Sequence, residues 1–293
     1  MNTTRRIPGQ LNRLTLATLL CLSTTVGAEE AQQLPEMTVE GAAMSGSAIF
    51  PIQLEQTPVT TADTAALLER APGGNVNRNG PLTGIAQYRG MYADQVNVLV
   101  NGIHINTGGP NGMDTPLSYI PRAQLESLEV MRGIAPVSSG LETIGGTMKA
   151  NAKTSHFSSG DEFTPSVDLM LGGASVDSSY SVNGFGAMSN RNHRMHVYGS
   201  LEKGDDYEFP GGTVTPSEYD RKNGGIGYGY QENGHEVGLN YRHNRTDDTG
   251  TPSLPMDIIY IDTDIFESEY SGTFGAYDVH GQLFYNDVDH KMN

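Results

Sequence analysis

The sequence contains no tryptophan and a single cysteine, and basic residues are scarce, with 18 Lys and Arg against 34 Asp and Glu. The formal net charge of −16 argues against nucleic acid as a partner, because phosphate binding requires a basic face. Apolar residues make up only 37% of the chain, whereas glycine occurs 36 times. This composition is atypical of a helix bundle or a densely packed α/β enzyme.

Long hydrophobic runs are also missing beyond the N-terminus. No run of ~18 apolar residues follows residue 30, so the sequence predicts no internal transmembrane helix. A membrane β-barrel is compatible with these numbers, since its strands alternate in polarity and their mean hydropathy is low. The enzyme signatures Gly-x-Ser-x-Gly, HExxH and the P-loop are absent as well. We therefore expect a protein that is not an enzyme.

The first 28 residues have the features of a secretory signal. Basic residues between Arg5 and Arg13 precede a short apolar run over residues 14–26, and small residues lead to Ala28. Such a run is too short to span a membrane as a helix, and we expect cleavage after Ala28. The only cysteine, Cys21, is removed with the signal, so the mature chain has no thiol for a disulfide, a metal or a nucleophile. The signal predicts a location outside the cytoplasm.

Residues 29–60 are polar with scattered prolines, which indicates a flexible arm. Within the arm, Pro35–Glu40 has a core with strand propensity. An exposed segment of this kind can add itself to the edge of a partner's sheet. Two plainer interpretations are a first strand of the following domain and an ordinary linker.

Residues 61–155 predict a small mixed αβ domain with long loops. A short helix is expected over residues 61–71, with Thr61 or Asp63 as its N-cap. Asn101-Gly102 is a strong signal for a hairpin between two strands. We expect strands at residues 95–100, 103–105, 127–133 and 144–150.

From residue 156 onward, segments of roughly ten residues alternate apolar with small or polar side chains, as the strands of outer-membrane barrels do. Short turns between the segments alternate with long polar loops, which we place at residues 203–223 and 244–263. The glycine-rich segments, the tyrosines at their ends and the loop asymmetry favour an outer-membrane barrel over a soluble β-sandwich. The predicted strands are 166–174, 180–188, 194–202, 224–231, 235–243, 264–275 and 278–288.

The number of predicted strands is odd, whereas bacterial single-chain barrels have even numbers. An open sheet also leaves two unpaired edges, which lipid does not tolerate. The sequence stops at Lys291-Met292-Asn293, directly after the last segment. We therefore expect the chain to be the N-terminal piece of a longer protein.

Short motifs stand in a fixed order along residues 61–155. They are LLERAPG at 67–73, YRGM at 88–91, VLVNG at 98–102, IP at 120–121, LESLEVMRG at 125–133 and IGG at 144–146. This order resembles the plug of TonB-dependent outer-membrane receptors. Met37-Thr38-Val39 also falls where such receptors keep their TonB box, so the resemblance covers residue 35 to the end.

The resemblance implies a fold class: an N-terminal α+β plug domain over residues 61–155, followed over 156–293 by antiparallel transmembrane strands that begin a barrel of about 22 strands. It also implies active import across the outer membrane of a Gram-negative bacterium, in contact with outer-membrane lipid. TonB, with its inner-membrane energising complex, would be the partner, and residues 36–40 would be the TonB box. The residues implied for the TonB contact are Glu36, Met37, Thr38 and Val39.

Three stretches resemble the outer-membrane copper receptors within this family. They are residues 109–119, 250–258 and 286–292. The resemblance implies copper ligands at Met113 in the plug and at His290 and Met292 in the barrel, with copper as the transported ligand and no obligatory cofactor. Gly109 stands where that subfamily has a cysteine, so we expect weaker copper binding.

The chemistry of these residues favours a soft metal by a separate route. Thioether and imidazole donors suit Cu(I) better than Zn(II) or Fe(III). His290 and Met292 are two positions apart on an extended segment, so both should point to one face. If the plug enters from the periplasm, the first and seventh strands run outward, and the plug loop at 107–114 can meet residues 289–292 at the outer end.

A ferric siderophore or another metal chelate is the competing cargo. Sites for such ligands rely on aromatic and basic side chains, for which the candidates are Tyr88, Arg89, Tyr92 and Tyr119. Acidic loop residues either attract cations such as Ca²⁺ or are solvated charges. These residues are Asp205, Asp206, Glu208, Asp247, Asp248, Asp262 and Asp264.

Two other classes of protein stay open at this point. A passive porin needs the barrel but does not explain residues 61–155 or the box at 36–40. A soluble periplasmic binding module requires the segments after residue 156 to close into a sandwich. Membrane fractionation separates the soluble module from the other two, and TonB dependence of uptake separates a receptor from a porin.

Overall fold

The computed structural model describes residues 49–54, 62–105, 114–133 and 143–293. The signal, the TonB-box residues, Gly109 and Met113 lie outside the described residues. No helix in the described ranges is long and apolar enough to cross a membrane. We call the described part between residues 49 and 152 the plug, and the seven-stranded sheet of residues 164–292 the wall.

The plug is built on a five-stranded sheet in the order β1-β7-β8-β5-β6. β5 runs parallel to β8, and the other neighbours are antiparallel. Asn101 and Gly102 join β5 to β6 with φ of 52° and 77°, the left-handed turn that an Asn-Gly pair favours. The strands are β1 Ile49–Pro51, β5 Asn97–Val100, β6 Ile103–His104, β7 Leu125–Met131 and β8 Thr147–Ala152.

A three-stranded sheet of β2, β3 and β4 is a feature that we did not predict from the sequence. β2 has the sequence Gly-Asn-Val-Asn-Arg, in which only Val76 is buried, so the alternation typical of a strand is weak. The strands are β2 Gly74–Arg78, β3 Gly84–Tyr88 and β4 Met91–Tyr92. The plug also contains the 3-10 helices η1 Thr64–Arg70, η2 Ala93–Gln95, η4 Pro116–Tyr119 and η5 Arg122–Gln124.

The helix expected over residues 61–71 is the 3-10 helix η1. Asp63 is its N-cap, since its Oδ1 accepts a hydrogen bond of 3.0 Å from the backbone N–H of Ala65. Leu67 and Leu68 are 2% and 0% exposed. The helix is thus fixed by its cap at one end and by two core leucines.

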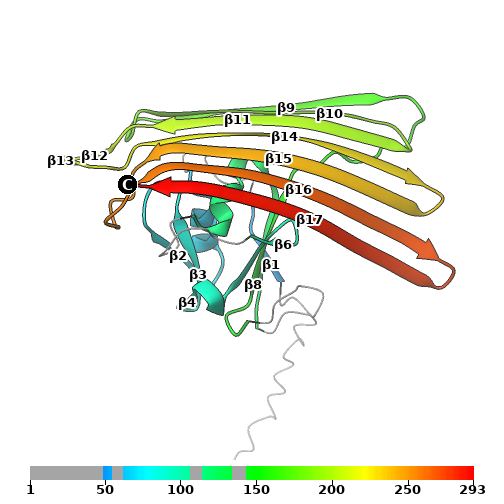
Figure 1. Cartoon of the computed structure of the whole chain (residues 1–293), viewed down its shortest axis with the longest axis horizontal. Helices are drawn as coiled ribbons and strands as arrows, with labels where there is room; N and C mark the ends of the chain where they lie inside the picture. Colours follow the sequence, from blue (N-terminus) through cyan, green and yellow to red (C-terminus); the bar gives the residue numbers. More distant parts are fainter. Residues whose placement is uncertain (1–48, 55–61, 106–113, 134–142) are drawn as a thin grey trace, which may run out of the picture. The chain divides into compact units, whose positions relative to one another are not determined.

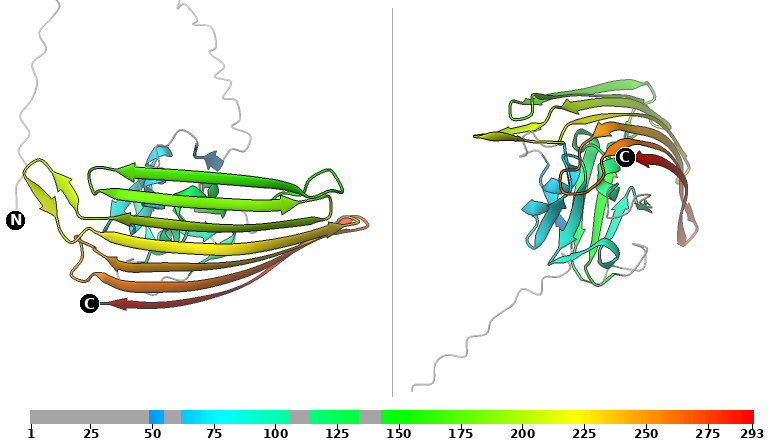
Figure 2. Two further views of the ribbon diagram at one scale, coloured as in Figure 1. Left: turned by 90° about the horizontal axis from the view of Figure 1, so that it is seen from above. Right: turned by 60° about the vertical axis from the view of Figure 1, so that its left-hand side comes forward.

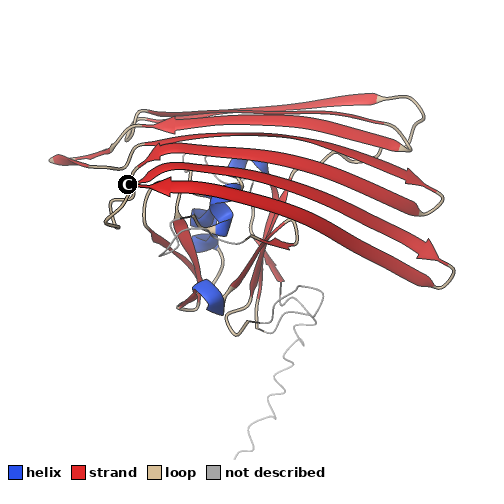
Figure 3. Ribbon diagram, viewed as in Figure 1, coloured by secondary structure: helices blue, strands red, loops and turns tan. Residues whose placement is uncertain are grey.

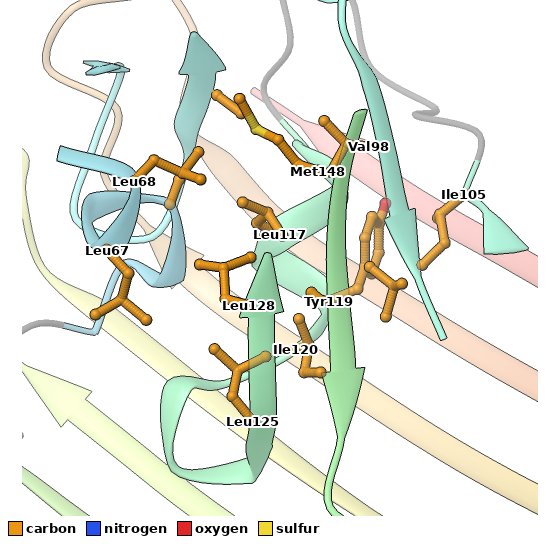
Figure 4. Packing of buried hydrophobic residues seen from close by; sticks show 14 of the residues in the cluster. Leu67, Leu68, Val98, Ile105, Leu117, Tyr119, Ile120, Leu125, Leu128 and Met148 are labelled. Carbon is orange, nitrogen blue, oxygen red and sulfur yellow. The ribbon is translucent and has the colours of Figure 1, made fainter. Parts of the chain in front are cut away.

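Aliphatic side chains from the plug sheets and 3-10 helices form one hydrophobic core (Figure 4). Leu117 on η4 and Leu128 on β7 are 1% and 0% exposed. The wall contributes Ile258, Ile261 and Ile265 to the same core. The plug therefore packs as a conventional apolar interior that three wall residues extend.

The wall is an antiparallel sheet in the order β17-β16-β15-β14-β11-β10-β9 (Figures 1 and 3). Each long strand pairs with the next long strand along the chain, and β9 and β17 stand at the two ends of the order. All seven predicted segments are strands. Their bounds are β9 Thr164–Ala174, β10 Ser179–Ser189, β11 His193–Gly204, β14 Tyr219–Glu232, β15 His235–Thr249, β16 Ile258–Phe274 and β17 Tyr277–Met292.

The long loops expected at residues 203–223 and 244–263 are shorter in the structure. β14, β15 and β16 extend into these ranges, and only residues 250–257 connect β15 to β16. The sequence hides these strand ends because both faces carry polar side chains there, as in the Arg-His-Asn-Arg-Thr-Asp-Asp run at 242–248. A small hairpin lies in the first range, formed by β12 Tyr207–Phe209 and β13 Gly212–Val214.

The two faces of the wall differ in polarity, and the sheet curves along its strands (Figure 2). Polar side chains alternate into the buried face, where Arg221 and Glu267 are 0% and 1% exposed. The opposite face carries exposed apolar side chains, with Leu169 at 66% and Leu283 at 76%. This arrangement is the reverse of a half-buried sheet in a soluble protein.

Candidate metal site where the plug meets the wall

His290 and Met292 lie at the end of β17, and both face the plug. Val288, His290 and Met292 are half-buried, whereas Asp289 and Lys291 between them are exposed. Val288 and Met292 pack against the hydrophobic core. The two-residue spacing therefore presents an imidazole and a thioether on the same face of the strand.

Asp114 is the plug residue that meets His290. Nδ1 of His290 lies 3.7 Å from Oδ2 of Asp114, whose side chain is fully buried. The hydroxyl of Tyr119 donates a hydrogen bond of 3.0 Å to the same Oδ2. Burial, with the added charge of Asp114, raises the pKa of Tyr119 well above its usual range, so this hydroxyl keeps its proton and stays a donor.

Asp114, the one described residue of the predicted loop 107–114, meets His290 of the predicted stretch 289–292. Met113 itself lies outside the described residues, so its part in the site stays a prediction. We assigned Asp114 no role from the sequence. A carboxylate directly after a candidate ligand is a signal, but its partner lies far along the chain.

Imidazole and thioether make a donor pair that is neutral and suits a soft cation. The carboxyl group of Asp114 lies beside this pair, with its Oδ2 3.7 Å from Nδ1 of His290. Thr115, which directly follows Asp114 in the chain, lines a cavity of about 850 Å³. Tyr92, Asp94 and His104 line the same cavity. The described geometry therefore offers two soft donors, one buried carboxylate and a cavity nearby on the plug.

Arg221 on β14 ties the wall to the plug. Its Nε donates to Oε2 of Glu202 at 2.7 Å, and its Nη1 and Nη2 donate to the carbonyls of Ser118 and Ala62 at 3.1 and 2.7 Å. The arginine is fully buried. This single side chain thus holds two separate stretches of plug backbone.

A second polar link surrounds the Asn101 turn. The side-chain amide of Asn101 donates to Oε2 of Glu267 at 3.0 Å, and Arg242 forms an ion pair with the same carboxylate. Nε2 of Gln282 on β17 donates to the Asn101 carbonyl at 2.9 Å. The turn that the sequence predicted is therefore also an attachment point to two wall strands, β16 and β17.

The aromatic and basic side chains proposed for a siderophore are divided between core and surface. Tyr88 and Tyr119 are 1% and 3% exposed, which favours packing roles for both. Arg89 is exposed and lies over the ring of Tyr88, 5.3 Å from its centroid, and Tyr92 is 52% exposed. Arg89 and Tyr92 are thus the accessible members of this set.

Asp247, Asp262 and Asp264 lie on β15 and β16 rather than in loops. Arg245 binds Asp247 and Asp262 at 2.7 Å each, and Nδ1 of His243 lies 3.0 Å from Asp264. His243, Asp262 and Asp264 could together hold a metal ion by their spacing. Each of these carboxylates is nevertheless paired with a basic or imidazole side chain.

Comparison with known proteins shows which family this chain resembles. Residues 38–147 match the family model described as the TonB-dependent receptor plug domain. The vitamin B12 transporter BtuB of Vibrio vulnificus (strain YJ016) is 31% identical over 193 residues, which are 63% of this chain and 27% of BtuB. The chain therefore spans only about a quarter of the length of this relative.

Solved structures agree with the family model. The copper transporter OprC matches with a TM-score of 0.76 and 26% identity, over 84% of this chain and 38% of that chain. The siderophore receptor PirA from Acinetobacter baumannii matches with a TM-score of 0.63 and 16% identity, over 83% of this chain and 40% of that chain, which shows the fold alone. The predicted resemblance to TonB-dependent receptors and the predicted fold, a plug followed by antiparallel strands, are confirmed.

Proposed function

We propose that this chain, which carries the plug of a TonB-dependent receptor and the antiparallel strands that follow it, serves the active import of copper across the outer membrane of a Gram-negative bacterium. One observation carries the copper assignment: His290 and Met292 share the plug-facing side of β17 beside Asp114. Copper is the cargo in this proposal, and no obligatory cofactor is needed.

The donor chemistry supports copper as the cargo. A thioether and an imidazole favour Cu(I), and Met113 next to Asp114 would add a second thioether. The likeness to OprC, a copper transporter by name, supports the same cargo. With Gly109 in place of a cysteine the site has no thiolate, so we expect weaker binding than in a thiolate-containing site.

The outward face of the wall supports contact with outer-membrane lipid. Its exposed side chains are apolar along the strands, as at Leu169, and aromatic residues lie both among them, as at Phe266, and near the short turns. An apolar band flanked by aromatic residues is typical of transmembrane strands. The exposed aromatic residues near the short turns are Phe163, Tyr228, Phe274 and Tyr277.

The copper site is tested by the metal content of the intact receptor after Cu(I) loading. We expect His290→Ala, Met292→Ala and Met113→Ala each to lose most of the bound copper. Lys291→Ala is the matched control, because Lys291 lies between the two wall ligands and is exposed. Equal copper in all variants would leave a TonB-dependent receptor for a different cargo.

Energy coupling is tested at Thr38, within the TonB-contact residues Glu36–Val39. Proline removes a backbone donor and fixes φ, so a strand at this position could no longer add to the edge of a partner's sheet. We expect Thr38→Pro to abolish uptake while copper binding stays normal. Normal uptake by this variant would move the TonB contact to another segment.

A ferric siderophore is the second candidate cargo, favoured by the accessibility of Arg89 and Tyr92. A direct comparison separates the two cargoes. Uptake of radiolabelled ferric siderophore that is lost in Arg89→Ala but kept in His290→Ala would favour the chelate. Uptake of copper that is lost in His290→Ala but kept in Arg89→Ala would favour copper.

A further inference from the structure

The Asp114 carboxylate occupies an unusual position. It is fully buried, and its Oδ2 faces two side chains, the hydroxyl of Tyr119 at 3.0 Å and Nδ1 of His290 at 3.7 Å. Burying a carboxylate costs free energy unless donors surround it. The Tyr119 hydroxyl is one donor, and the His290 ring is placed to supply another.

The His290 ring is held with one nitrogen turned inward. Nδ1 is enclosed and has no hydrogen-bond partner among the described residues, although the side chain as a whole is 21% exposed. The exposed surface of the side chain therefore belongs to atoms other than Nδ1. Nε2 is the ring nitrogen left to meet a cation.

The position of the single proton on neutral imidazole decides what each nitrogen can do. With the proton on Nδ1, the ring can donate to Asp114, and the lone pair of Nε2 is open to a metal. With the proton on Nε2, the Nδ1 lone pair would face a carboxylate oxygen in a buried site, which is unfavourable. The geometry thus selects one tautomer.

We propose that Asp114 is a positioning residue for His290: it holds the imidazole proton on Nδ1 and so presents Nε2 to a soft monovalent cation. This inference rests on the proposed function and deepens it. The donors His290 and Met292 are neutral, so the buried carboxylate is also the group that compensates the charge of the cation. The separation of 3.7 Å should shorten to a hydrogen bond when metal draws electron density from the ring.

The tautomer is measured on the metal-free, intact receptor. Histidine is labelled with ¹⁵N, and the His290 ring signals are assigned by their loss in His290→Gln. We expect the wild type to carry the proton on Nδ1 and Asp114→Asn to shift the population toward Nε2–H. Asp63→Asn is the matched control, because Asp63 is another buried plug carboxylate and caps η1 instead.

Metal affinity is measured by competition for Cu(I) with a chromophoric chelator. We expect Asp114→Asn to weaken Cu(I) binding by roughly 10–100-fold, as loss of a carboxylate behind a histidine ligand does, and Asp63→Asn to leave it unchanged. Unchanged affinity and tautomer in Asp114→Asn would overturn the inference. Cu(I) that shifts the Nδ1 signal instead of Nε2 would also overturn it, since the metal would then lie between the two side chains.

The two proposals fail in different ways. A wild-type receptor that binds no Cu(I) contradicts the copper assignment. The tautomer measurement needs no metal and decides the pairing of Asp114 with His290 in either case. An Nε2–H tautomer in the wild type therefore removes the positioning role even if copper binds.

Discussion

The plug and the wall bury opposite kinds of side chain. In the plug, Leu68 and Leu128 are 0% exposed, whereas the buried face of the wall holds Arg221 and Glu267 at 0% and 1%. Leu169, on the other face of the wall, is 66% exposed. One rule explains both patterns: apolar side chains are stabilised where they are removed from water. In the plug they are removed into the core, and on the outward face of the wall they are removed into lipid if the sheet lies in the membrane as proposed. The medium beside each face, and not strand formation itself, thus decides which residues are buried.

The two regions also hold together by different forces. The plug depends on a continuous aliphatic core, to which the wall adds three isoleucines. Away from that core, the joint between plug and wall includes polar contacts made by Arg221, Asn101 and Gln282. Substitutions in the two regions should therefore differ in size and in mechanism.

The largest effect is expected from Arg221→Met, which breaks the polar joint. This variant leaves Glu202 buried without its partner and removes the donors to the carbonyls of Ala62 and Ser118. We expect the free energy of unfolding to fall by ~3–5 kcal/mol, as when one partner of a buried ion pair is removed. Chemical unfolding in detergent measures the loss.

Arg245→Met is the matched control for this prediction. Arg245 lies on the outward face, pairs with Asp247 and Asp262, and its side chain is 33% exposed. We expect it to cost ~1 kcal/mol or less, since solvent screens such pairs. Equal losses of unfolding free energy in the two arginine variants would mean that the buried Arg221 contacts stabilise the fold no more than the exposed Arg245 ion pairs do.

A smaller but still large effect is expected in the plug core. Leu128→Ala removes a fully buried side chain and should lower the free energy of unfolding by ~2–5 kcal/mol. Leu169→Ala on the outward face should cost much less, because no packed cavity is left behind. A larger loss for Leu169→Ala in the same unfolding experiment would contradict the opposite burial of the two regions.

The third effect depends on pH and belongs to Asp63. Burial raises the pKa of this plug carboxyl from its usual 3.8 to about 6. Between these values the folded state binds more protons than the unfolded state, so stability falls as pH rises from about 4 to about 6. The fall is up to ~3 kcal/mol, at ~1.4 kcal/mol for each pH unit.

Asp63→Asn tests this slope because asparagine keeps the N-cap of η1 but does not titrate. Unfolding free energies are compared at pH 4.5 and 7.5 for both proteins. The wild type should lose more stability than the variant as the pH rises. Parallel changes in both would show that folding does not raise the pKa of Asp63.

The smallest effect is expected where the plug meets β17. Tyr119→Phe removes the donor to Asp114 and should cost ~1–2 kcal/mol, since the acceptor is a buried carboxylate. Tyr88→Phe is the matched control, because the hydroxyl of Tyr88 is buried without a hydrogen-bond partner in the described structure. Thermal unfolding of both variants measures the difference, and equal costs would contradict a special role for the Tyr119 hydroxyl.

Local patterns predicted more of the wall than of the plug. The period-two alternation located all seven long strands, and the Asn101-Gly102 pair located the β5–β6 turn. The same signal failed for β2, where only Val76 is buried, and for the ends of β14 to β16, where both faces are polar. Alternation reveals a strand only where its two faces meet different surroundings.

The sequence by itself determined the class of fold, the order of its motifs and the shared face of His290 and Met292, because turn chemistry and a two-residue period are local properties. Only the tertiary structure decided that Arg221 meets Ser118 and that Asp114 meets His290. Each of these pairs unites a plug residue with a wall residue far along the chain. Their meeting depends on the register of every strand between them and on how the plug packs, and no local pattern encodes either.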